Sequence, residues 1–66
     1  MVAIASSMIS GADYDQDAGE LIVTFKNGAR WAYKAPAEEF DALVGAGSAG
    51  QHFLNAIKGQ YPERRL

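Results

Sequence analysis

Apolar and polar residues repeat with a period of two through the first half of the chain and with a helical spacing through the second. Residues 20–26 are rich in β-branched and aromatic side chains and predict the clearest strand. Residues 8–14 predict an earlier strand, in which Gly11 weakens the pairing or marks a bulge. Residues 29–34 predict a return strand. The first half is therefore expected to form three strands in chain order.

Two turns connect these predicted strands. Residues 15–20 combine short acids that bond their own backbone with a glycine suited to positive φ, and Asn27-Gly28 is a strong hairpin signal. A two-residue loop would pair Lys26 with Ala29, whereas a three-residue loop that includes Lys26 shifts the register by one and reverses the face assignment. We expect the three-residue loop, with Gly28 in the left-handed position, because it gathers the large apolar groups on one face.

This register divides the side chains of the hairpin between two faces. The buried face is expected to carry Leu21, Val23, Phe25, Ala29, Trp31 and Tyr33. The other face is expected to carry Ile22, Thr24, Arg30, Ala32 and Lys34. The two-residue loop would instead place Arg30, Ala32 and Lys34 beside Leu21, Val23 and Phe25. Trp31 and Tyr33 are thus predicted to point inward.

A first helix is predicted to begin at Pro36, whose missing N–H costs nothing at the first helical position. Acidic residues favoured by the helix dipole follow at Glu38, Glu39 and Asp41. The spacing i, i+3, i+4 predicts an apolar stripe of Phe40, Leu43 and Val44. Gly45 and Gly47 are expected to end this helix.

A second helix is predicted to begin at Ser48, with Gln51 completing a capping box. Its buried stripe is expected to be Phe53, Leu54 and Ile57. Gly59 ends it and Pro62 prevents it from resuming. The chain is therefore predicted to be a single α+β domain spanning residues 1–66, in which a three-stranded antiparallel meander precedes two short helices packed on one face.

Composition narrows the function classes. The chain has 66 residues, 48% of them hydrophobic, which suits one small globular domain rather than a disordered chain. It has no cysteine and one histidine, so we expect no disulfide, no thiolate or histidine-rich metal site and no cofactor. No apolar run is long enough for a membrane span or a signal peptide, so a cytoplasmic protein without membrane association is expected.

Three groups of residues are weak candidates for a metal site or a catalytic site, and the first is a cluster of acids. Asp13, Asp15 and Asp17 resemble the start of a calcium loop, but the glycine and glutamate that this loop requires at its sixth and twelfth positions are Ala18 and Thr24. A solvated acidic turn is the better interpretation.

His52 has no second histidine and no evident acidic partner. Ser6 and Ser7 lie in neither a nucleophile elbow nor a triad order, so they are expected to bond the backbone before the first strand. Without a visible acid–base pair or activated nucleophile, the protein is expected not to be an enzyme.

The net charge of −2 disfavours non-specific nucleic-acid binding by the chain as a whole, but the charges are segregated and local potential matters more. Cations interleave with rings in residues 26–34, as in single-strand binders. The candidate nucleic-acid contacts are Lys26, Arg30, Lys34, Lys58, Arg64 and Arg65. A weaker candidate is anion binding at the glycine-rich step before the second helix, by Gly47, Ser48 and Gly50.

A set of residues spaced along nearly the whole chain forms a recognisable pattern. In the sheet these residues are Ser6, Ser7, Ile9, Tyr14, Asp15, Leu21, Val23, Phe25, Gly28, Trp31 and Tyr33. In the helices they are Pro36, Phe40, Leu43, Ala46, Ser48, Gly50, Phe53, Ile57, Lys58 and Tyr61. Their order and spacing resemble the KTSC domain, a short module found at the C-terminus of some lysyl-tRNA synthetases and as stand-alone bacterial and phage proteins.

Two departures from the family pattern stand out. The family often has Tyr-Phe-Asn where this chain has His52-Phe53-Leu54, with Asn55 one place later, and it usually has Tyr where Trp31 stands. The resemblance implies no catalytic residues and suggests RNA binding. Sequence therefore favours a small non-enzymatic binding module for RNA or another nucleic acid. The alternatives are a protein-interaction or phage accessory module that docks on a host protein, or a binder of a small nucleotide or anion. Each is compatible with a homo-oligomer.

Overall fold

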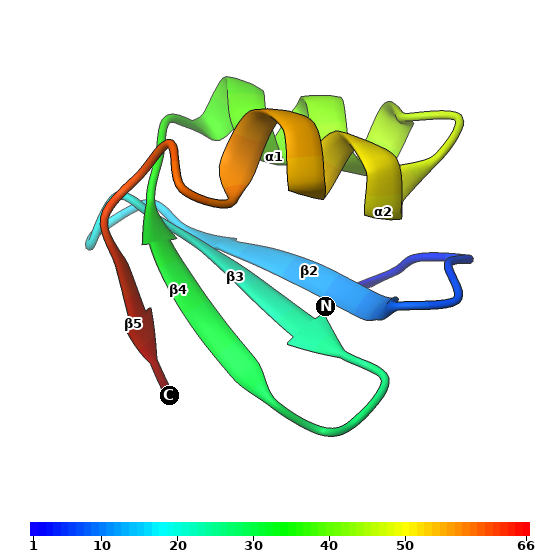
Figure 1. The fold of residues 1–66 in the computed structure, drawn as a ribbon. Coiled ribbons are helices and arrows are strands. Elements are labelled where there is room, and N and C mark those ends of the chain that lie inside the picture. Colours follow the sequence, from blue (N-terminus) through cyan, green and yellow to red (C-terminus); the bar gives the residue numbers. More distant parts are fainter.

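A five-stranded antiparallel sheet carries one layer of helices in the computed structural model, which describes residues 1–66 (Figure 1). The strands lie side by side in chain order, so every strand pairs with its neighbours in sequence. The elements are β1 (Val2–Ala3), β2 (Ile9–Asp15), β3 (Glu20–Phe25), β4 (Arg30–Lys34), α1 (Ala37–Gly45), α2 (Ala49–His52), the π-helix η1 (Phe53–Ile57) and β5 (Glu63–Arg65).

The α+β class, the antiparallel sheet and the two helical segments agree with the sequence, but the prediction of three strands was wrong. The two additional strands, β1 and β5, are the edges of the sheet. Both are exposed along their whole length and are too short to show an alternating pattern. Only their pairing with β2 and β4 makes them strands, and this pairing is a tertiary contact that local sequence does not encode.

The three-residue hairpin loop between β3 and β4 is confirmed. Val23 lies opposite Trp31 in the ladder, and the Phe25 N–H donates to the Ala29 carbonyl at 2.8 Å. Gly28 has a φ of 89°, in the left-handed region that a residue with a Cβ rarely adopts. The apolar side chains of the hairpin consequently share the face that carries the helices.

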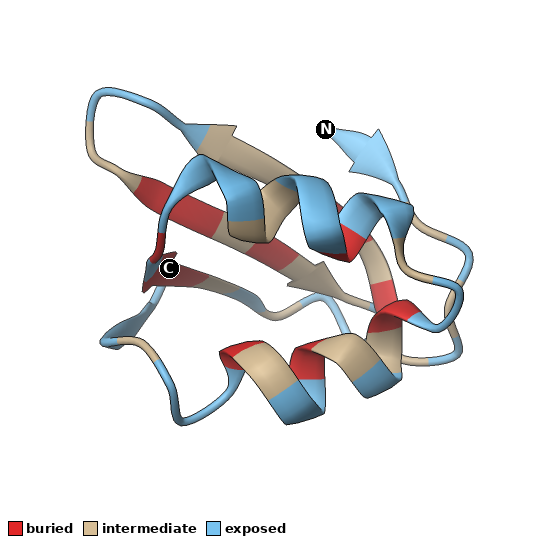
Figure 2. Ribbon diagram, turned by 90° about the horizontal axis from the view of Figure 1, so that it is seen from above, coloured by how far each residue is buried: buried red, intermediate tan, exposed pale blue.

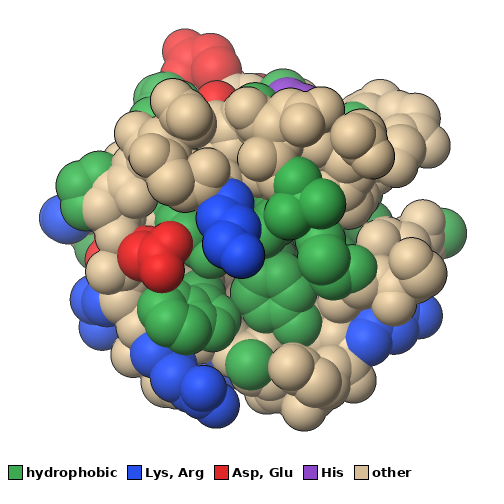
Figure 3. Space-filling model, viewed as in Figure 1, with side chains coloured by type: hydrophobic (Ala, Val, Ile, Leu, Met, Phe, Trp, Pro, Cys, Tyr) green, Lys and Arg blue, Asp and Glu red, His purple; other side chains and the backbone are tan.

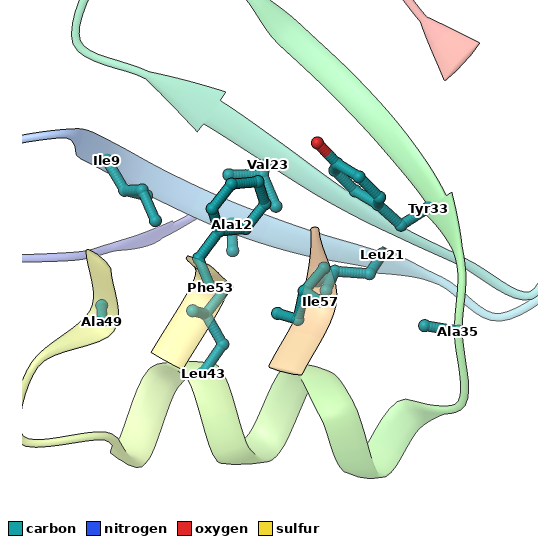
Figure 4. Close-up of a cluster of buried hydrophobic side chains, with 10 residues drawn as sticks. All are labelled: Ile9, Ala12, Leu21, Val23, Tyr33, Ala35, Leu43, Ala49, Phe53 and Ile57. Carbon is teal, nitrogen blue, oxygen red and sulfur yellow. The ribbon is translucent and has the colours of Figure 1, made fainter. Parts of the chain in front are cut away.

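The core fills the space between this sheet face and the helical layer (Figure 4). In Figure 2, buried positions alternate with exposed ones along the helices, which leaves their outer surface in solvent. The buried cluster is Ile9, Ala12, Leu21, Val23, Tyr33, Ala35, Leu43, Ala49, Phe53 and Ile57. The helices supply few large side chains to this cluster, so each of those side chains matters to stability.

The predicted apolar stripe of α1 is narrower in the structure. Leu43 is fully buried and Phe40 is partly buried, but Val44 is 40% exposed. The helix also begins one residue later than predicted, at Ala37, because Pro36 has the extended backbone of an N-cap. It ends at Gly45 as expected.

The second stripe changes because α2 continues as a π-helix. The Lys58 N–H donates to the Phe53 carbonyl at 2.9 Å, five residues back. The wider turn aligns the buried residues Ala49, Phe53 and Ile57 at intervals of four along the core-facing side. Leu54, predicted to be buried, is 50% exposed. The π-helix thus turns Leu54 out of the core and toward solvent.

The predicted caps and turns are present. Asp15 accepts hydrogen bonds from backbone N–H groups of the β2–β3 turn at 3.1 Å, and the Ser48 hydroxyl accepts one from the Gln51 N–H at 3.4 Å. The ladder of β2 shifts between Ile9 and Gly11, which is the predicted irregularity. A Cβ on Gly11 would lie 2.8 Å from the β1 backbone, so glycine lets β1 approach closely.

Two polar contacts fasten the C-terminal segment to the rest of the domain. On the outer face of the sheet, Arg64 donates two hydrogen bonds of 2.9 Å to the nearly buried carboxylate of Glu20. On the helical side, the Tyr61 hydroxyl donates to Glu39 at 2.9 Å, and His52 Nε2 lies 2.8 Å from the other oxygen of Glu39. Glu39 is therefore the acidic partner of His52 that the sequence did not reveal.

The outer face of the sheet is less open than predicted at one position. Ala32 was assigned to this face, and it is on it, but only 1% of its surface is exposed. It lies in a hollow with the longer side chains of Glu20, Lys34 and Arg64, which surround it. None of the helices has the length and apolar character needed to cross a membrane.

Truncation of Leu43 should expose how much the core depends on α1. Leu43→Ala is expected to lower the free energy of unfolding by about 2–5 kcal/mol, because a fully buried leucine leaves a cavity. The matched control Val44→Ala removes a 40% exposed side chain from the same helix and should cost less than about 1 kcal/mol. Urea unfolding followed by Trp31 fluorescence measures both. Equal losses would contradict the burial of α1 described above.

The ion pair of Glu20 and Arg64 should make stability depend on acid pH. The hydrogen bonds from Arg64 are the main cause that lowers the pKa of Glu20 below its ordinary value of 4.5. The folded state then binds this proton less readily than the unfolded state, so the contribution is complete above pH 4.5 and is lost as pH falls through the folded pKa.

The variant Glu20→Gln lacks this titration. The stability difference between wild type and Glu20→Gln should be constant near neutral pH and should shrink in the acid range, as measured by thermal unfolding across pH. A difference that does not change with pH would refute the linkage.

Candidate functional site

An apolar groove opens between η1 and the β3–β4 hairpin, on the side of the sheet that carries the helices. Its volume is about 360 Å³. The lining residues are Met8, Phe25, Trp31, Tyr33, Phe53, Leu54, Lys58 and Glu63. Figure 3 shows the hydrophobic surface gathered between the helices and the strands, with basic side chains and an acidic side chain beside it. It is the most apolar hollow in the structure, and half of its lining residues are aromatic.

The rings of the groove pack against one another through Phe53. The centroid of Phe53 lies 5.3 Å from that of Phe25 and 5.6 Å from that of Tyr33, both in edge-to-face geometry. Phe53 and Tyr33 are only 3% exposed, whereas Phe25 and Trp31 are partly exposed. Buried rings thus form a rigid floor, and the partly exposed rings offer their surfaces to a ligand.

Burial raises the pKa of Tyr33 to about 12, and the nearby Glu63 carboxylate adds to this effect. The phenol therefore stays protonated at neutral pH and can donate a hydrogen bond. The groove consequently presents ring surfaces and a neutral hydroxyl, with Lys58 and Glu63 as its charged lining residues.

Three of the basic residues predicted from sequence lie on or near this groove. Lys58 follows η1 and lines the groove directly. Arg65 lies opposite Trp31 in the β4–β5 ladder, and cross-strand partners share a sheet face, so Arg65 is on the helical side. Lys26 follows Phe25 in the hairpin loop. All three are exposed, and none belongs to the three ion pairs of the structure.

The other three predicted basic residues lie on the opposite face. Arg30, Lys34 and Arg64 alternate with the groove residues along β4 and β5. Arg64 is bound by Glu20, and the Lys34 ammonium donates to the Ala18 carbonyl at 3.0 Å. The structure therefore divides the predicted basic patch between two faces, and two of the three residues on the outer face already have partners.

The glycine-rich step forms a different hollow, of about 380 Å³, between α2 and the loop that precedes β2. Gly47, Ser48 and Gly50, the residues predicted to bind an anion, line it together with Ser6 and Ser7. The Ser48 hydroxyl already caps Gln51, and the Ser6 hydroxyl accepts from the backbone N–H groups of residues 8 and 9. No charged side chain lines this hollow, so it lacks the cation that an anion site usually uses.

The aromatic groove itself was missed by the sequence analysis. The rings were predicted to be inward-facing core residues, and Tyr33 and Phe53 are. The signal that could have revealed the groove is an excess of rings on the hairpin face compared with the few large side chains of the helices. Short helices leave part of that face uncovered, and the uncovered part lies beside Trp31.

Asp13, Asp15 and Asp17 were interpreted as an acidic turn. Asp15 caps that turn through its side chain, as described above, and these acids lie at the end of the β2–β3 hairpin, away from the groove lining. In the whole chain no group of three or more histidine or acidic side chains is arranged to hold a metal ion.

Comparisons with known proteins agree on the family. The family model of the KTSC domain matches residues 5–61. An uncharacterized protein of Stutzerimonas stutzeri strain A1501 is 39% identical over 61 residues, which cover 91% of this chain and 86% of that protein. The crystal structure of a KTSC domain protein from Yersinia pestis superposes with a TM-score of 0.90 at 28% identity, covering 97% of this chain and 92% of that one.

The family match spans both the sheet and the helices, including most of the residues that line the groove. The structural match shows that the sheet and its helical layer are arranged as in a solved member of the family. This chain belongs to the KTSC domain family.

Proposed function

We propose that this KTSC domain binds single-stranded nucleic acid in the aromatic groove. The observation that carries the proposal is the combination, at one place, of partly exposed rings and exposed cations without partners. Phe25 and Trp31 offer ring surfaces on which bases can stack, and Lys58 stands at the groove wall to meet a phosphate. Arg65, opposite Trp31, extends the positive charge along the same face.

The ring surfaces and the small volume of the groove favour single-stranded over double-stranded nucleic acid. Bases within a duplex are stacked on each other, so their faces cannot reach rings on a protein, whereas unstacked bases can. A volume of about 360 Å³ lies at the small end of ligand pockets, which suits a contact with very few bases. Base–ring stacking tolerates any base, and the proposal therefore carries no sequence preference.

The distribution of charge supports this location rather than the outer sheet face. Asp15 ends β2 and Asp17 lies in the β2–β3 turn, and the acidic residues Glu38 and Asp41 lie on α1. The net charge of −2 thus hides an uneven distribution, in which Lys58, Arg65 and Lys26 outnumber the one acid that lines the groove, Glu63. A local positive potential is sufficient to attract phosphate groups.

Protein docking is the second candidate function, and the observation that favours it is the aliphatic part of the groove. Leu54 is 50% exposed and Met8 is partly exposed, both beside the rings. Exposed apolar side chains of this kind suit an apolar side chain from another protein. Nucleic acid is the leading proposal because it explains both the exposed cations without partners and the partly exposed rings.

Two charge reversals of equal size test the proposal. Lys58→Glu alters the groove, and Arg30→Glu makes the same charge change on the outer sheet face. Short single-stranded RNA and DNA are titrated at several salt concentrations, with ligand anisotropy and Trp31 emission followed together. Wild type should bind with salt-sensitive affinity and perturb Trp31. Lys58→Glu should weaken binding several-fold and reduce the salt slope by about one.

Arg30→Glu should leave the affinity close to that of wild type, because its side chain is directed away from the groove. Equal effects of the two variants would contradict the groove as the site. Absence of binding at low salt would overturn the nucleic-acid proposal and leave the groove to a protein partner.

A further inference from the structure

The outer edge of β5 is an open strand edge. The backbone N–H of Lys34 donates to the Pro62 carbonyl at 2.9 Å, and the backbone N–H of Leu66 donates to the Arg30 carbonyl at 2.9 Å. Backbone groups alternate in direction along an antiparallel strand, so Glu63 and Arg65 direct their N–H and C=O groups away from β4. Figure 1 shows β5 as the outermost strand, with no element beyond it. This edge can therefore accept another strand.

The charges on this edge are complementary to those of a second copy. Glu63 and Arg65 are both exposed, neither is in an ion pair, and they flank Arg64 symmetrically. When two such strands meet antiparallel and centred on Arg64, each Glu63 lies opposite Arg65 of the partner subunit. Edge strands guarded by charges of one sign repel a second copy, whereas this mixed pattern attracts one.

Arg64 lies at the centre of this pairing, and its charge is already offset within its own chain. Each Arg64 would lie opposite Arg64 of the partner subunit, which by itself is unfavourable. The guanidinium of Arg64 is held by two hydrogen bonds of 2.9 Å to Glu20 of its own chain, so its charge is offset before the two copies meet. The opposite edge of the sheet, β1, has only Val2 and Ala3 and offers no charge complementarity.

From these observations we infer that the domain forms a two-fold symmetric dimer by antiparallel pairing of β5 edges, with Glu63 and Arg65 exchanged across the interface. The axis of such a pair is perpendicular to the sheet, so both helical layers and both grooves face the same side. The contact is short, so the dimer is weak and forms as concentration rises. The inference concerns the protein without nucleic acid and does not depend on the proposed function.

Sedimentation velocity from micromolar to millimolar protein, without nucleic acid, tests the inference. Wild type should shift from monomer to dimer over this range. Glu63→Arg and Arg65→Glu should each weaken the dimer by about tenfold, because each creates two like-charge pairs. The exchanged variant, with both substitutions, restores opposite charges and should recover the dimer. Circular dichroism confirms that each variant is folded.

A cross-link provides a second measurement that does not rely on charge. The chain has no cysteine, so the double variant Glu63→Cys, Arg65→Cys carries the only thiols. Paired residues lie about 5.5 Å apart between Cα atoms, within disulfide range. Oxidation should yield a covalent dimer. A monomer at every concentration, or dimerisation that ignores the charge reversals and leaves the thiols unlinked, would overturn the inference.

Discussion

The register of the β3–β4 hairpin decides the properties of both faces of this domain. A three-residue loop with Gly28 at its left-handed position places Val23 opposite Trp31 and directs both toward the helices. A shift by one residue would move every ring of β4 to the other face. It would also bring Arg30 and Lys34 under the helices, where their charges would be costly to bury. Core, groove and basic residues therefore all depend on one turn.

The helical layer then determines which part of that apolar face becomes a groove. The helices are short, and the π-helix aligns Ala49, Phe53 and Ile57 with the core while it turns Leu54 outward. The rings of Phe53 and Tyr33 are covered, and those of Phe25 and Trp31, nearer the hairpin loop, are only partly covered. π-Helical turns are frequent at functional sites. Here the turn supplies Phe53 to the floor of the groove, Leu54 to its wall and Lys58 to its rim.

Local chemistry was sufficient to predict much of the fold. Alternation, the Asn27-Gly28 signal and the cap at Ser48 identified the central strands, the turns and the helices from residues that act on their neighbours in sequence. The edge strands could not be predicted, because β5 is made a strand by its pairing with β4, and the contacts of Arg64 and Tyr61 with acids far away in the chain fasten it there. Those contacts have no local signature.

The candidate site was only partly predictable for the same reason. The sequence identified Lys58 and Arg65 as basic and Trp31 as aromatic, but it grouped the cations into one patch and sent the rings inward. Which cations are free depends on acids that the fold brings near them, as Glu20 does for Arg64. Which rings are exposed depends on how far the helices extend. The pairing of the cations and the exposure of the rings both depend on tertiary packing, which involves residues from the whole chain.

Nuclear magnetic resonance tests the central claim, that the groove is the binding surface, most directly. Amide and indole signals are recorded while a short single-stranded RNA is added to the uniformly labelled domain. The account predicts that shifts concentrate at Phe25, at Lys58 and at the Trp31 indole, which line the groove, and leave Arg30 and Lys34 nearly unchanged. Shifts confined to the outer sheet face, or no shifts at low salt, would contradict it.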